Sequence, residues 1–266
     1  MNHKKHRSRR YRNSTKNALL IAVLSSFALS FLIPSTSGNA FVYNALTFIG
    51  IVFAILVGFF ITDLYTRYVY IRQNAAADSS NLGSYYYLAS ILADETGDTA
   101  WLELTKQRIK IYVHVFMPLP WERYGQTEVA YDELGKSLKE LKVSTPKALE
   151  TYRTMLSVYT QHGTTREVLV MFGKDKLSLG EWLTLGVLGS LLVSALFLTK
   201  GADIASILFT GGIMSAVLIL FIILRDLNNL NFGEHAVSVE PYERVLENIG
   251  EDRYYSEQGK RTKSQV

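Results

Sequence analysis

Residues 40–62 read AFVYNALTFIGIVFAILVGFFIT and contain no charged side chain. A helix needs about 20 residues, at about 1.5 Å each, to cross a hydrocarbon core about 30 Å thick. This run is long enough by itself, and Ile204–Leu224 is a second run of sufficient length. Both predict transmembrane helices, because such long uncharged apolar runs are not typical of a soluble core.

Two shorter apolar runs accompany them, Ala18–Ile33 and Leu183–Leu198. The first can be extended through Asn17 and Pro34–Ser37, and the second through Leu177–Gly180, all of which are uncharged. We therefore predict an all-α integral membrane protein with four transmembrane helices, arranged as two hairpins around a cytoplasmic helical insert. For the first run a cleaved signal peptide is the alternative, because a basic start, an apolar stretch and small residues also make that pattern.

The basic residues predict the orientation of these spans. Seven Lys and Arg and no acid lie in residues 1–16, and they account for the net charge of +4. The predicted turn Pro34–Asn39 is uncharged, and the Thr199–Asp203 loop has Lys200 as its base. By the positive-inside rule, both termini and the middle segment are cytoplasmic, in an inner or plasma membrane. The rest of the chain is slightly acidic, which argues against a nucleic-acid partner.

Charge and hydropathy divide the chain into five segments. These are a basic cytoplasmic tail (1–17), a first transmembrane hairpin (18–64), a cytoplasmic helical region (65–178), a second transmembrane hairpin (179–224) and a cytoplasmic C-terminal tail (225–266). The helices predicted outside the membrane are Tyr65–Ala93, continuing the second span, then Thr99–Met117, Gln126–Lys142, a helix from Thr145 to His162, Thr165–Phe172 and Glu240–Asn248. Thr145 and Pro146 are typical of an N-cap and a first helical position.

The sequence carries no enzyme signature. Cysteine is absent, and the motifs GxSxG, HExxH, CxxC and Walker A do not occur. The five histidines lack metal-ligand spacing outside the basic tail, so we interpret them as structural or solvated. Neither a metal nor a cofactor is expected, and the protein is predicted not to be an enzyme.

Small residues recur every four positions in two of the predicted spans. Gly50, Ala54 and Gly58 form such a face in the second span, and Gly186 and Ser190 form another in the third. Faces of this kind let a neighbouring helix approach closely. We predict that both are used for helix packing.

A stripe of larger side chains lies beside the first of these faces. Ile51, Ile55 and Phe59 follow one another at the same spacing, and Asp63 extends the stripe at the cytoplasmic edge. Such stripes more often face lipid or a protein core than a pore. Periodicity alone therefore does not distinguish a pore from a packing surface.

Two parts of the chain, Gly58–Tyr68 and Arg225–Tyr242, resemble segments of bestrophins, and more closely of the bestrophin-like family of membrane proteins. Gly58–Thr62, followed by Thr66-Arg67-Tyr68, is similar to the segment where the second bestrophin span leaves the membrane. Arg225–Gly233, followed by Val237–Tyr242, is similar to the Phe-Gly stretch after the last span and the motif that follows it. The two-hairpin arrangement with a long middle segment is also shared.

The resemblance implies an ion channel, arranged as a homopentamer with the second helix of each subunit around the axis. Its apolar neck corresponds to Ile51, Ile55 and Phe59, and its mouth to Thr62, Asp63 and Arg67. The implied partners are the lipid bilayer, further copies of the chain and small inorganic ions. Chloride-like anions are the first expectation and cations the second, because Asp63 would favour cations and Arg67 anions.

Calcium gating is not expected, because Asn228, Asn229 and Asn231 stand where calcium would need charged oxygen ligands. The alternative to a channel is a non-conducting membrane scaffold or signalling protein. In that protein, the four helices would anchor the chain while the cytoplasmic helices bind a partner.

Overall fold

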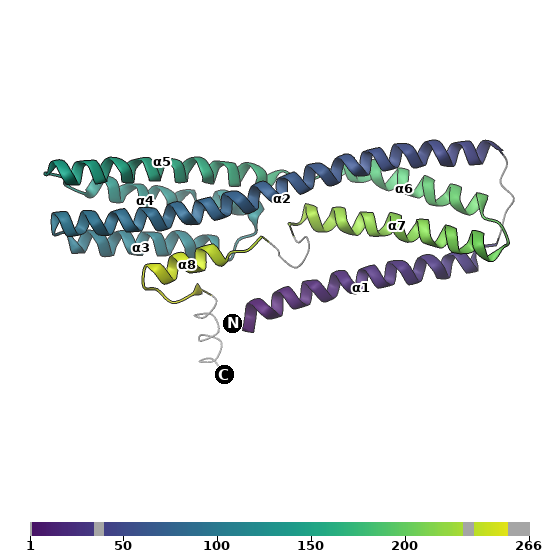
Figure 1. Cartoon of the computed structure of the whole chain (residues 1–266), viewed down its shortest axis with the longest axis horizontal. Helices are drawn as coiled ribbons and strands as arrows, with labels where there is room; N and C mark the ends of the chain where they lie inside the picture. Colours follow the sequence, from purple (N-terminus) through teal and green to yellow (C-terminus); the bar gives the residue numbers. More distant parts are fainter. Residues whose placement is uncertain (1, 35–39, 231–236, 255–266) are drawn as a thin grey trace. The chain divides into compact units, whose positions relative to one another are not determined.

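The computed structural model describes residues 2–34, 40–230 and 237–254, which form helices and connecting segments without a strand (Figure 1). They divide into two compact units. Of the described residues, the membrane unit comprises 5–34, 40–68 and 176–230, and the helical unit comprises 2–4, 69–175 and 237–254. Helix α2 (Ala40–Thr96) contributes its first part to the membrane unit and its second part to the helical unit.

The membrane unit contains α1 (Asn2–Leu32), the first part of α2, α6 (Leu179–Thr199) and α7 (Ile204–Asn228). Three helices, α2, α6 and α7, are long and apolar enough to cross a membrane, and α1 contributes the shorter apolar segment Asn17–Leu32. The basic segment predicted as a separate tail is helical from Asn2 and continuous with this apolar segment. From Ser35 on, the predicted turn Pro34–Asn39 lies outside the described residues.

Local capping explains where α6 and α7 begin. Ser178 and Glu181 form a reciprocal capping box, in which each side chain accepts a hydrogen bond from the other's backbone N–H. Asp203 caps α7 by accepting a hydrogen bond of 2.8 Å from Ser206 N. Because Glu181 is used in a cap, a charged residue can stand close to the start of an apolar helix.

The helical unit is built from the second part of α2 and five further elements. These are α3 (Thr99–Phe116), the 3₁₀ helix η1 (Trp121–Thr127), α4 (Glu128–Glu140), α5 (Pro146–Lys174) and α8 (Glu240–Asn248). Four of the helices predicted outside the membrane are confirmed to within a few residues. They are the continuation of α2 beyond the apolar span, α3, α4 and α8. Element η1 was not predicted. Gly97 follows the last residue of α2 and has a φ of 73°, a left-handed conformation that glycine adopts readily and that often ends a helix.

Helix α5 is continuous, so the prediction of two segments separated around Gly163 was wrong. Gly163 lies inside the helix without ending it. Its lack of a side chain makes room for the Tyr131 hydroxyl of α4. Gly135 of α4 makes room for the Tyr159 hydroxyl of α5 in the same way. The two tyrosine rings stack 4.7 Å apart and are nearly parallel. The glycines therefore serve close packing between α4 and α5, a use that a single sequence does not distinguish from helix termination.

Candidate functional site

The stripe predicted to line a neck lies on the outside of the membrane unit. Ile51, Ile55 and Phe59 are 56%, 67% and 65% exposed. The opposite side of α2 is buried within the unit through Phe53 and Val57. The helix therefore has two apolar faces, of which one packs inside the chain and the other is open to lipid or another chain.

The residues predicted for the mouth do not all share this outer face. Thr62 and Asp63 are exposed, and the Thr62 hydroxyl donates a hydrogen bond of 2.9 Å to Gly58 O. Arg67 is only 2% exposed and turns into the unit. Its Nη1 donates a hydrogen bond of 3.0 Å to the backbone oxygen of Asn228 near the end of α7.

Burial of Arg67 has a clear physical reason. The last carbonyls of a helix lack partners within the helix and attract cations, so a guanidinium is stabilised there. The Asn228 side chain adds a second link, because its Oδ1 accepts a hydrogen bond of 2.9 Å from Leu177 N. Arg67 thus connects α2 with the end of α7, and the asparagine is used for structure. The sequence signal for this role was the 3.6-residue period, which turns Arg67 away from Ile51.

The predicted packing faces make few contacts inside the chain. Gly50 approaches Leu192, whose Cδ1 would lie 3.7 Å from an added Cβ. Among the described residues, no atom lies within 4 Å of a Cβ built on Gly58 or Gly186. Ala54 and Ser190 are exposed. These small residues stay predictions for packing between copies of the chain.

Close helix packing inside the membrane unit uses two other glycines. A Cβ on Gly189 would meet the Phe221 ring at 3.0 Å, and one on Gly211 would meet the Phe27 ring at 2.7 Å. The first contact joins α6 to α7, and the second joins α7 to α1. Neither glycine belongs to a regular four-residue repeat with other glycines, so spacing did not identify them.

Lys200, in the short α6–α7 connection, is also buried against α1. Its ammonium donates hydrogen bonds to the backbone oxygens of Ser30 and Ile33, the latter at 2.6 Å. Ser30 in turn donates to Ile207 O at 2.7 Å. A cation at the C-terminal end of α1 complements its unpaired carbonyls. The α6–α7 connection and α7 therefore hold α1 by a polar contact as well as by the Phe27–Gly211 contact.

The helical unit contains a buried polar cluster around Asp78 of α2. Asp78 Oδ2 accepts hydrogen bonds from Tyr124 at 2.6 Å and from Tyr242 at 2.7 Å. Its Oδ1 lies 2.9 Å from His162 Nδ1, and the Tyr112 hydroxyl lies 2.8 Å from that of Tyr124. Burial raises the pKa of the three tyrosines well above the ordinary value of 10.0. The cluster brings together α2, α3, η1, α5 and α8.

The geometry of this cluster indicates a role in stabilising the fold. Each member is enclosed by the unit, and a buried polar group is stabilised only when it is hydrogen bonded or paired. The expectation that the histidines are solvated or structural left the role of His162 open, and Asp78 was not identified at all. Their partners come from five elements, so no local motif signals the site.

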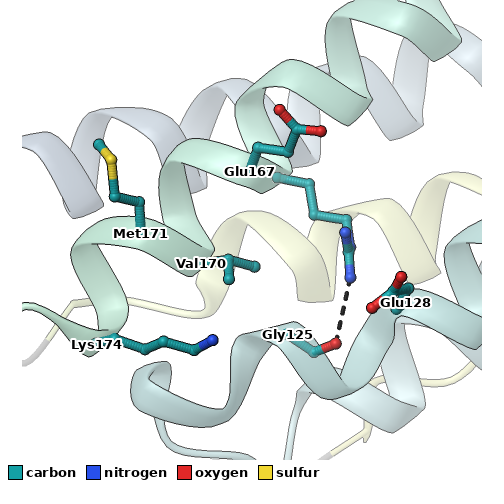
Figure 2. Close-up of a pocket in the computed structure, with 7 residues that line it drawn as sticks. Gly125, Glu128, Glu167, Val170, Met171 and Lys174 are labelled. Atoms are coloured by element: carbon teal, nitrogen blue, oxygen red, sulfur yellow. Dashed lines mark hydrogen bonds between the residues drawn. The ribbon is translucent and has the colours of Figure 1, made fainter.

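A shallow pocket of about 370 Å³ lies between α5, η1 and α4. Figure 2 shows Val170 and Lys174 of α5 on the side of Gly125, with Glu167 further along α5 and Glu128 on α4. Arg166 also lines it, but its guanidinium bonds to Thr127 Oγ1 and Gly125 O. Charges of both signs surround the pocket, so it favours no particular ligand charge. Across the described part of the chain, no group of three or more metal-ligating side chains gathers.

Comparison with known proteins adds the family. The model of the bestrophin-like domain matches residues 17–242. The chain belongs to the bestrophin-like family. This bestrophin-like protein is a membrane protein, and the match includes the exposed stripe, Arg67 and the Asp78 cluster. No curated protein and no solved structure matches it.

Proposed function

We propose that this bestrophin-like protein is a passive ion channel formed by several copies of the chain around the exposed stripe of α2. The main observation in support is that the side chains of Ile51, Ile55 and Phe59 are more than half exposed, on a helix whose other face is buried. Family membership supports a channel over an enzyme. In a ring of subunits, these side chains would form an apolar constriction that closes by dewetting and conducts when wet.

The proposed topology has four spans in two hairpins, with both termini cytoplasmic in the cell membrane. The contacts of α1 with Lys200 and Gly211 support a retained first span, because they place its apolar segment against the second hairpin. The proposed mouth keeps Thr62 and Asp63 and omits Arg67. Its exposed charge is then Asp63, which would attract cations there, against the expectation of chloride.

Planar bilayers containing the purified protein test the proposal. We expect the wild type to conduct, and Ile51→Ala and Phe59→Ala to increase conductance by widening the neck. Val187→Ala is the matched control, since Val187 is similarly exposed but lies on α6. Under a potassium chloride gradient, Asp63→Asn should move the reversal potential toward the equilibrium potential of chloride. Absence of conductance in the wild type and in both neck variants would refute a channel.

The oligomeric mass in detergent separates the channel from a non-conducting scaffold. One chain has a mass of 30.0 kDa, and a mass near five chains favours a pore around α2. A monomer without conductance favours the scaffold, with the stripe facing lipid.

A further inference from the structure

A groove on the membrane unit combines apolar walls with a basic end. It has a volume of about 310 Å³ and is lined by residues of α1, α6 and α7: Ala22, Trp182, Leu218, Phe221, Ile222 and Arg225. Four of them, from Leu218 to Arg225, follow the i, i+3, i+4, i+7 pattern of one helix face. The volume is at the lower end of the range for ligand pockets, which is about 300–1,000 Å³.

The groove lies at the border of the apolar segments. Arg225 directly follows the apolar run Ile204–Leu224, and Trp182 stands close to the start of α6. Because a short connection joins α6 to α7, these two positions lie at the same end of the hairpin. Tryptophan and arginine are typical of the membrane interface, where one end of a side chain meets lipid headgroups. Leu218 precedes Arg225 by two helical turns, so the groove extends about 10 Å into the apolar part.

Arg225 keeps donors available at this end. Its Nε and Nη2 donate to Asp226 Oδ1 at 3.1 Å and 2.9 Å. A guanidinium has five N–H donors. Its side chain is 48% exposed, and Nη1 has no partner among the described residues. Asp226 orients the guanidinium and offsets part of its charge without covering it.

The basic residues of α1 favour an anionic ligand. The helix that supplies Ala22 carries seven Lys and Arg in residues 1–16. Basic residues at the cytoplasmic end of membrane helices attract anionic lipids. A neighbouring protein helix could fill the apolar walls, but it would also need an anionic group at the level of Arg225. An anionic phospholipid carries both parts in one molecule.

We propose that this groove binds an anionic phospholipid. One acyl chain lies along Leu218, Phe221 and Ile222, and the headgroup phosphate accepts hydrogen bonds from Arg225. The site does not depend on conductance, so it can exist whether or not the protein is a channel.

Quenching of Trp182 fluorescence by brominated acyl chains tests this site in the full-length protein. The protein is placed in phosphatidylcholine vesicles containing equal fractions of dibrominated phosphatidylglycerol or dibrominated phosphatidylcholine. The other two tryptophans, Trp101 and Trp121, belong to helices of the helical unit, so Trp182→Phe defines the signal of the groove. We expect about fivefold preferential quenching by the anionic lipid, the ratio that about 1 kcal/mol per arginine gives.

The variants decide the origin of this preference. Arg225→Gln should remove the fivefold preference that this arginine supplies, leaving only what residues 1–16 contribute, and Arg225→Lys should retain it, whereas Arg244→Gln removes a charge on α8 and should leave it unchanged. Equal quenching by both lipids, unaffected by Arg225→Gln, would show ordinary boundary lipid and overturn the proposal. Absence of quenching by either lipid would show a groove covered by protein, and would also overturn it. Should Arg225→Gln not fold, the wild type still decides, because equal quenching by the two lipids would overturn the proposal.

Discussion

The two parts of helix α2 are built for different surroundings. In the membrane unit its outward side chains are Ile51, Ile55 and Phe59, and its contacts within the unit are mostly apolar. In the helical unit the same helix buries Asp78, which bonds to two tyrosine hydroxyls. A single helix can thus follow the rules of a lipid environment and then those of a water-soluble core, because neighbouring elements decide which face is covered.

Alkaline pH should reveal this contrast most strongly. In the unfolded chain, Tyr112, Tyr124 and Tyr242 ionise near their ordinary pKa of 10.0, whereas burial raises the pKa of each in the folded unit. Their stabilising contribution is therefore complete below pH 10 and is lost as pH rises above it. Between the two pKa values, each tyrosine lowers the free energy of unfolding by up to about 1.4 kcal/mol per pH unit. Circular dichroism with tyrosinate absorbance should show cooperative unfolding of the helical unit.

The exposed tyrosine Tyr87 provides the control for this titration. Tyr87→Phe should leave the pH of unfolding unchanged. If all tyrosines ionised together near pH 10 while helicity was retained, the buried cluster would be wrong.

Removing the centre of the cluster should have the next largest effect. Asp78→Ala leaves two buried hydroxyls without their acceptor and removes the carboxylate beside His162, and we expect a loss of about 3–5 kcal/mol in the free energy of unfolding. Denaturant unfolding in detergent measures it. Asp132→Ala removes an exposed carboxylate from α4 and should change stability by less than about 0.5 kcal/mol. Equal effects of the two variants would contradict the cluster.

In the membrane unit, the largest polar effect should come from Lys200. Lys200→Met removes the ammonium from the end of α1 and leaves backbone oxygens of Ser30 and Ile33 without this donor, with a loss of about 2 kcal/mol. Thermal unfolding in detergent measures the change. Lys200→Arg keeps the charge and should recover part of the stability. A Lys200→Met protein as stable as the wild type would contradict the contact with α1.

Two glycine substitutions should differ in sign between the units. Gly163→Ala places a methyl group against the Tyr131 hydroxyl and should lower stability by about 1 kcal/mol, although alanine favours helix. Gly186→Ala has open space within the chain and should raise stability by up to about 1 kcal/mol. Thermal unfolding measures both. A smaller oligomeric mass for Gly186→Ala would instead indicate packing between copies.

Sequence patterns predicted single helices better than contacts between them. Apolar length located the long spans, and caps such as Thr145 located helix starts, because both depend on neighbouring residues. The continuity of α5 was missed, since the reason for Gly163 is a tyrosine on another helix. Arg67 shows the same limit for the site. Its position after the second span suggested a pore mouth, but its partner is a backbone oxygen of α7, 161 residues away in sequence.

The contact of Lys200 with α1 has a consequence for the order of assembly during synthesis. Ser30 lies 170 residues before the lysine that binds its backbone oxygen. The end of α1 therefore emerges from the ribosome long before its partner exists, and water or lipid headgroups must solvate its carbonyls until then. The first helix therefore reaches its final contacts only after Lys200 has been synthesised, and chains that stop before Lys200 should contain an α1 whose last carbonyls lack this donor.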